Sequence, residues 1–202
     1  MALLRLSDGR VYTTLEDISR HIGSTRVGSF EYPEPFRKKV ASLTLPLTEE
    51  GANYIFENLD SKVVSLLRIE GLVHRTIGCV IPPTKEGGGF VFAFGASGKD
   101  TSPQKKTAAE VKAYLTPHAV QVTDWHLCMS GAFVKGLQLE GDLQGVLYVQ
   151  PGEWIRLNAS VKNWPVFPLG QATVGVSFFD KQPGTFGQID YPELKIKPEV
   201  LF

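Results

Sequence analysis

The sequence has few cysteines, no excess of either charge and no long apolar run. Two cysteines, Cys79 and Cys128, stand among 202 residues, too few for a disulfide framework, so we expect buried free thiols rather than a bridge. Basic and acidic residues number 21 each, and a zero formal net charge creates no broad field to attract nucleic acid or an anionic membrane. No stretch approaches a membrane span, and the start lacks an apolar signal core. These absences predict a cytoplasmic protein without nucleic-acid or membrane partners.

The chain length fits one domain, over 1–202, large enough to bury a core and form one pocket. In the region 1–61, capping residues and apolar spacing predict a short strand and helices that pack outside a sheet. Thr13 or Thr14 can cap a first helix, which Gly23 ends. Thr48 can cap a second helix over 48–59. From Lys62 onward, branched aliphatic residues become frequent and predict that the β region begins there.

Segments of strand character dominate the rest of the chain and are separated by glycine and proline turns. One such segment runs over 76–81 and is ended by Pro82. Five more cover 118–128, 132–139, 143–149, 153–158 and 171–179. The Gly-, Ser- and Lys-rich stretch 84–107 predicts an inserted loop or hairpin, followed by a short helix up to Leu115. This rhythm is typical of a closed antiparallel barrel or a sandwich.

Two stretches reproduce the residue spacing of the cupin signatures. His118 is followed by Asp124 and, six residues later, by Gly131, as in the first signature with its two histidines, glutamate and glycine. The distance from Gly152 to Asn163 matches the second signature, which ends in histidine. The chain therefore resembles the cupin superfamily. This resemblance implies a mainly β fold, an antiparallel jelly-roll barrel with a few peripheral N-terminal helices, with the barrel motifs in 118–180.

Within the cupins, the sequence resembles the acireductone dioxygenases of bacteria, especially the cyanobacterial type. The similarity starts at 11–20, continues through the strand at 71–77 and extends over 118–180 without a gap; only 84–107 looks inserted. In that family two histidines, a glutamate and a third histidine bind iron or nickel. The corresponding positions here are His118, Val120, Asp124 and Asn163. Valine cannot bind a metal and an amide is a poor ligand, so the resemblance implies a degenerate metal site.

His126 lies two residues after Asp124, so in a strand both side chains point to the same face. Three interpretations are open. With His118 they form a relocated site of two imidazoles and a carboxylate for a divalent ion such as iron, nickel, manganese or zinc. Without a metal, the pair acts as an acid/base couple. In the third, the pair is structural. The resembled family usually has a substrate-facing arginine at position 126.

Three further residues are candidates for substrate contact. His118 and Asn163 occupy former ligand positions, and Cys128 continues the face of Asp124 and His126. For Cys128 the alternative is a small buried thiol without a role in binding.

Three functions are consistent with these residues. In the first, the protein is an enzyme that binds a small organic molecule in the barrel and transforms it. The chemistry is metal-independent acid/base catalysis of the isomerase, cyclase or lyase type. The second is a metal-dependent, dioxygenase-like oxidoreductase using His118, Asp124 and His126. The third is a non-catalytic pseudoenzyme that acts as a binding or assembly protein, as a homodimer or with a protein partner. We favour the first, because a polar barrel interior is costly to bury without ligands, water or mutual hydrogen bonds.

Overall fold

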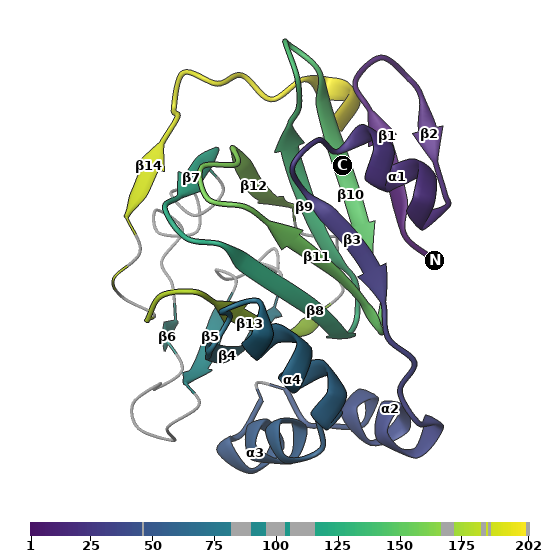
Figure 1. The fold of residues 1–202 in the computed structure, drawn as a ribbon, viewed down its shortest axis with the longest axis vertical. Helices are drawn as coiled ribbons and strands as arrows, with labels where there is room; N and C mark the ends of the chain where they lie inside the picture. The colour runs from purple at the N-terminus through teal and green to yellow at the C-terminus, as the bar shows by residue number, and fades with distance from the viewer. Residues whose placement is uncertain are drawn as a thin grey trace.

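The protein is described by a computed structural model that covers residues 1–45, 47–81, 90–95, 104–105, 116–166, 172–182, 185 and 187–200, with the backbone alone at 79–81, 90–95 and 104–105. Two seven-stranded sheets make up most of the described chain (Figure 1). All pairings between the described strands are antiparallel. The predicted mainly β, antiparallel architecture is therefore confirmed.

The strands of each sheet come from distant parts of the chain. The first sheet has the order β14 (Gln188–Asp190), β7 (His118–Val120), β12 (Asn163–Val166), β9 (Phe133–Gln138), β10 (Gln144–Val149), β1 (Leu3–Leu6) and β2 (Val11–Tyr12). The second has the order β3 (Arg26–Ser29), β11 (Glu153–Leu157), β8 (Asp124–Ser130), β13 (Thr173–Phe179), β4 (His74–Ile81), β5 (Phe90–Gly95) and β6 (Gln104–Lys105). Consecutive strands therefore often lie in opposite sheets, as in a jelly roll.

One predicted strand is in fact two. The segment 118–128 was expected to be continuous, but β7 ends at Val120 and β8 begins at Asp124 in the other sheet. None of the three residues between them belongs to a strand, and the first two form bends. No glycine or proline marks this break, which explains why strand propensity alone misses it. The break places His118 and Asp124 on opposite sheets.

The four described α-helices all lie before β4, within the first 69 residues. They are α1 (Leu15–His21), α2 (Glu34–Ala41), α3 (Glu49–Glu57) and α4 (Ser61–Ile69), with a short 3-10 helix, η1 (Pro198–Val200), near the end of the described chain. The predicted caps are confirmed, because the Thr14 side chain accepts a hydrogen bond from Asp17 N and that of Thr48 accepts one from Gly51 N. Figure 1 shows α2, α3 and α4 together at one end of the molecule and α1 beside β1 and β2.

The segment after Lys62, predicted to begin the β region, is helical instead. Asp60 caps α4 by accepting a hydrogen bond from Lys62 N, and Val63 and Leu67, four residues apart, are its buried side chains. Helical spacing and a good cap thus outweigh the β propensity of the valines. Among the described residues, no helix has the length and apolar character needed to cross a membrane. The remainder of the predicted insertion 84–107, apart from β5 and β6, and the predicted helix up to Leu115 lie outside the described residues.

Two main apolar clusters lie on opposite faces of the second sheet. Between this sheet and α2–α4 the cluster includes Ile55, Val63, Leu67, Trp125, Leu127, Met129, Val174, Val176 and Phe178. Between the two sheets the cluster includes Leu4, Leu6, Cys128, Leu137, Leu147 and Ile155. The space between the sheets thus contains a continuous apolar core.

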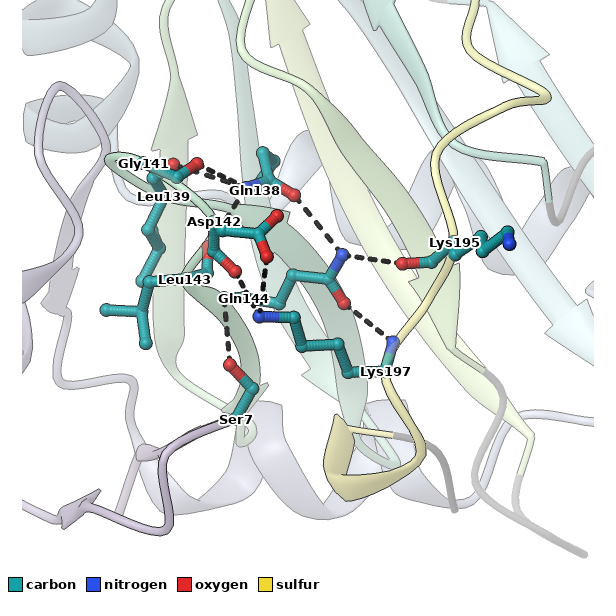
Figure 2. A network of polar contacts seen from close by, with 9 residues as sticks. All are labelled: Ser7, Gln138, Leu139, Gly141, Asp142, Leu143, Gln144, Lys195 and Lys197. Atoms are coloured by element: carbon teal, nitrogen blue, oxygen red, sulfur yellow. Dashed lines mark hydrogen bonds and ion pairs between the residues drawn. The ribbon is translucent and has the colours of Figure 1, made fainter.

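The C-terminal segment is fastened to β10 by a buried glutamine (Figure 2). Gln144 Nε2 donates to Lys195 O at 2.8 Å, and Lys197 N donates to Gln144 Oε1 at 2.8 Å. Gln138 Oε1 accepts a second bond from Gln144 Nε2 at 3.2 Å, and the Lys197 ammonium lies against Asp142. Gln144 is therefore a structural polar residue whose hydrogen-bonding groups are satisfied within the protein.

Candidate functional site

Alternate residues of β8 face two different environments. Trp125, Leu127 and Met129 belong to the cluster under the helices, whereas Cys128 belongs to the cluster between the sheets. Side chains two residues apart share a face, so Asp124 and His126 point into the space between the sheets, as the sequence predicts. These polar side chains, beside the apolar core of the same space, form the candidate site.

Asp124 and His126 are in direct contact. His126 Nε2 lies 2.9 Å from Asp124 Oδ2, and the two side chains keep 16% and 10% of their surface exposed. The pair is therefore largely desolvated but remains in reach of solvent. In such an environment a carboxylate orients the imidazole ring and stabilises its protonated form.

Ser177 completes the contacts of the His126 ring. It lies on β13 directly across from His126 in the antiparallel register, and its Oγ is 2.6 Å from His126 Nδ1. With Nε2–H donated to the carboxylate, Nδ1 of the neutral ring accepts the Ser177 hydroxyl proton. The structure thus contains a chain from Ser177 through His126 to Asp124. Sequence reasoning missed Ser177, because the pairing of two strands 50 residues apart leaves no local signal.

One oxygen of Asp124 has no partner among the described residues. Burial alone would raise the pKa of this carboxyl, but the charge and hydrogen bond of His126, together with the charges of Lys135 and His118, lower its pKa below the usual value. Asp124 is therefore ionised at neutral pH. Its Oδ1 is buried and has no hydrogen-bond partner among the described residues. An unpaired carboxylate oxygen in a desolvated space favours a ligand or water with a proton to donate.

The first sheet contributes His118 and Asn163, which are paired directly across β7 and β12. His118 is buried and its Nδ1 lies 2.9 Å from Thr116 O, so Nδ1 carries the proton and Nε2 remains an acceptor. Burial, followed by the nearby Lys135 charge, lowers the pKa of His118, although the bond to Thr116 opposes this. His118 is therefore neutral at physiological pH.

Lys135 is a site residue that the sequence reasoning did not select. It lies on β9 with 5% of its surface exposed, and its Nζ donates to Asn163 Oδ1 at 3.0 Å. Its ammonium also lies 5.5 Å from the centroid of the Phe133 ring. Burial lowers the pKa of Lys135, and the charge of Asp124 partly offsets this effect. The signal was present in the sequence, because Lys135 shares the inward parity of Phe133 and Leu137 in a predicted strand.

The remaining candidate, Cys128, lies with the apolar core residues. Its thiol is free and buried, and burial raises its pKa to about 12. The Sγ atom lies 3.8 Å from the carbonyl oxygens of Ser130 and Gly131. The side chain of Cys79 lies outside the described residues. At neutral pH Cys128 is therefore a protonated thiol in an apolar environment.

The residues present do not fit the metal of the resembled family. Val120 has no donor atom, and Asn163 Oδ1 already accepts a hydrogen bond from a lysine ammonium. Both ring nitrogens of His126 contact protein groups. In the part of the chain that the structure describes, no three His, Cys, Asp or Glu side chains are grouped as a metal site requires. The relocated set of His118, Asp124 and His126 is not assembled as a metal site here, and metal binding by these residues stays a prediction.

Comparisons with known proteins support the fold. No protein-family model matches the sequence, and no curated protein is similar to it at a significant level. Among solved structures, an acireductone dioxygenase from Bacillus anthracis with a cadmium ion in its active centre superimposes with a TM-score of 0.67 at 10% sequence identity. The match covers 90% of this chain and 94% of that one. The predicted cupin-type fold, similar to that of an acireductone dioxygenase, is thereby confirmed.

Proposed function

We propose that this chain is an acireductone-dioxygenase-like cupin with a diverged site, which binds a small organic molecule between its sheets and transforms it by metal-independent proton transfer of the isomerase, cyclase or lyase type. One observation carries the proposal. The His126 ring is held in the desolvated interior between Asp124 at 2.9 Å and Ser177 at 2.6 Å. Histidine with a carboxylate partner is a common general acid/base group in proteins.

The direction of the hydrogen bonds defines how the proton moves. A ligand proton transfers to Ser177 Oγ while the Ser177 hydroxyl proton moves to His126 Nδ1. The resulting imidazolium is stabilised by Asp124 Oδ2 through Nε2–H. Return of the proton to a different atom of the ligand gives an isomerisation, and no electron acceptor or donor is required. The low-dielectric surroundings strengthen each of these interactions.

The proposal is tested by deuterium exchange. The protein is incubated in D₂O with a panel of small carbonyl compounds, and exchange at carbons next to the carbonyl group is followed by NMR. We expect catalysed exchange that falls by about 100-fold or more in His126→Gln, as for loss of a general base. His21→Gln is the matched control, because His21 stacks on Tyr12 outside the site. Exchange that persists in His126→Gln, or that no compound shows, would count against the proposal.

A specific observation also supports an assembly role. Three apolar side chains on or just after α4 are exposed, namely Leu66 at 46%, Ile69 at 83% and Val73 at 57%. Exposed apolar groups that lie close together are typical of contacts between proteins. The homodimer or protein partner expected from the sequence would bind here. Sedimentation measures the oligomeric state of wild-type protein and of Ile69→Glu. A wild-type dimer that becomes a monomer in the variant supports the assembly role. A monomer in both excludes the homodimer.

A further inference from the structure

Lys135 stands apart from every other described basic side chain. It is the one lysine or arginine that is buried in the part of the chain that the structure describes. The remaining buried polar side chains of the candidate site are His118, Asp124 and Asn163. A buried ammonium is unfavourable unless hydrogen bonds and opposite charge compensate it. The fold therefore keeps Lys135 at a position where an apolar side chain would be less costly.

The hydrogen bonds of Lys135 leave its ammonium partly unused. An ammonium has three protons to donate, and among the described residues Nζ donates one, to Asn163 Oδ1 at 3.0 Å. Asp124 and Lys135 attract each other electrostatically, yet the hydrogen bond of the Asp124 carboxylate is formed with His126. Asp124 Oδ1 is likewise without a partner. Two opposite, incompletely satisfied charges thus face the same interior from different sheets.

The Lys135 ammonium lies among the positions that bind metal in the resembled family. His118, Asp124 and Asn163 occupy three of the four positions that bind metal in the resembled family. Lys135 Nζ contacts one of them directly, Asn163, and its charge acts on the other two. The lysine therefore supplies one positive charge among these positions. A fixed cation of this kind stabilises negative charge on a ligand oxygen without a metal ion.

We propose that Lys135 is the ligand-binding cation of this site and that the ligand is a small carboxylate carrying a hydroxyl group. The ammonium donates hydrogen bonds to the carboxylate oxygens, and Asp124 Oδ1 accepts one from the hydroxyl. The inference rests on the proposed function and deepens it by naming the class of substrate. It also accounts for both incompletely satisfied groups with one ligand.

Bromide is the probe for the anion site. Crystals of wild-type protein, Lys135→Met and Lys39→Met are soaked in bromide, and anomalous peaks are located. We expect a bromide within hydrogen-bonding distance of Lys135 Nζ in wild type and none in Lys135→Met. Lys39→Met is the control, because Lys39 is an exposed residue of α2, and it should keep this bromide. Lys135→Met removes the buried charge at similar side-chain length but leaves Asn163 Oδ1 without its donor, so the variant should stay folded with at most a modest loss of stability. A thermal melt checks this directly.

Lactate and lactamide are the matched probes in solution, since they differ in charge rather than in size. NMR titration should show lactate binding that exceeds lactamide binding by about tenfold or more and that falls by about as much in Lys135→Met. Equal binding of the two probes, no lactate binding, or unchanged lactate binding in Lys135→Met overturns the inference. If bromide and lactate bind at Lys135 but no carbonyl compound exchanges protons, the proposed function fails while the anion site stands. If wild type catalyses exchange but binds neither bromide nor lactate at Lys135, the anion site fails while the proposed function stands.

Discussion

The two faces of β8 differ in character although they belong to one strand. One face packs Trp125, Leu127 and Met129 under the helices. The other presents Asp124 and His126, which are hydrogen-bonded to each other, to the opposite sheet. Apolar burial stabilises the fold, whereas buried polar groups contribute little net stability even when paired. One face of β8 therefore stabilises the fold, and the polar face is better explained by a function.

Removing a large side chain from the helix-facing side should have the largest effect. Trp125 is 2% exposed and packs edge-on to Phe178 with ring centroids 5.6 Å apart. Trp125→Ala should lower the free energy of unfolding by about 3–5 kcal/mol through lost burial and a cavity. Urea denaturation measures this. A loss below about 1 kcal/mol would show that this face is not the stabilising one.

Changing the interior-facing side should separate activity from stability. His126→Gln removes the proton acceptor and should reduce proton exchange by about 100-fold, equivalent to about 2.7 kcal/mol of transition-state stabilisation. The same variant should unfold at a urea concentration close to that of wild type, because a polar side chain is replaced by another. A large loss of stability with little loss of exchange would reverse the assignment of the two faces.

Strand β9 provides the same comparison in the first sheet. Lys135 points inward, while the next residue, Gly136, lies under the Trp164 indole, where a Cβ atom would come within 1.9 Å of the ring. Gly136→Ala should destabilise the protein by about 1–3 kcal/mol because the indole must move. Calorimetry of this variant beside Lys135→Met tests the contrast. Equal destabilisation by the two substitutions would contradict it.

The smallest effect expected is a pH dependence of stability from His118. Burial lowers the pKa of His118 in the folded protein, so below about pH 6.5 the unfolded chain binds a proton that the folded chain resists. Stability should therefore fall as the pH drops through this value, until the lower pKa of the folded state is reached. Urea denaturation at several pH values gives the slope of the unfolding free energy against pH for wild type and for His118→Asn. Below about pH 6.5 this slope should be smaller in His118→Asn. An unchanged slope would assign the dependence to other groups.

Local patterns were enough to predict part of the site. The period of two in a strand correctly placed Asp124 and His126 on one face, and the cap at Thr48 located a helix. Ser177 and Lys135 were missed because their proximity to His126 and Asn163 depends on strand register and sheet order, which are non-local. The valines of α4 were misread because their β propensity was weighed above helical spacing. Sequence periodicity thus identified faces, and the structure supplied the partners across them.

We propose that the positive charge in the barrel interior comes from Lys135 and not from a metal. Elemental mass spectrometry of protein purified without a metal-affinity tag tests this proposal, with His126→Ala measured in parallel. We expect that neither protein contains a near-stoichiometric transition metal. Near-stoichiometric iron, nickel, manganese or zinc in wild type that disappears in His126→Ala would contradict it and establish a relocated metal site at His118, Asp124 and His126.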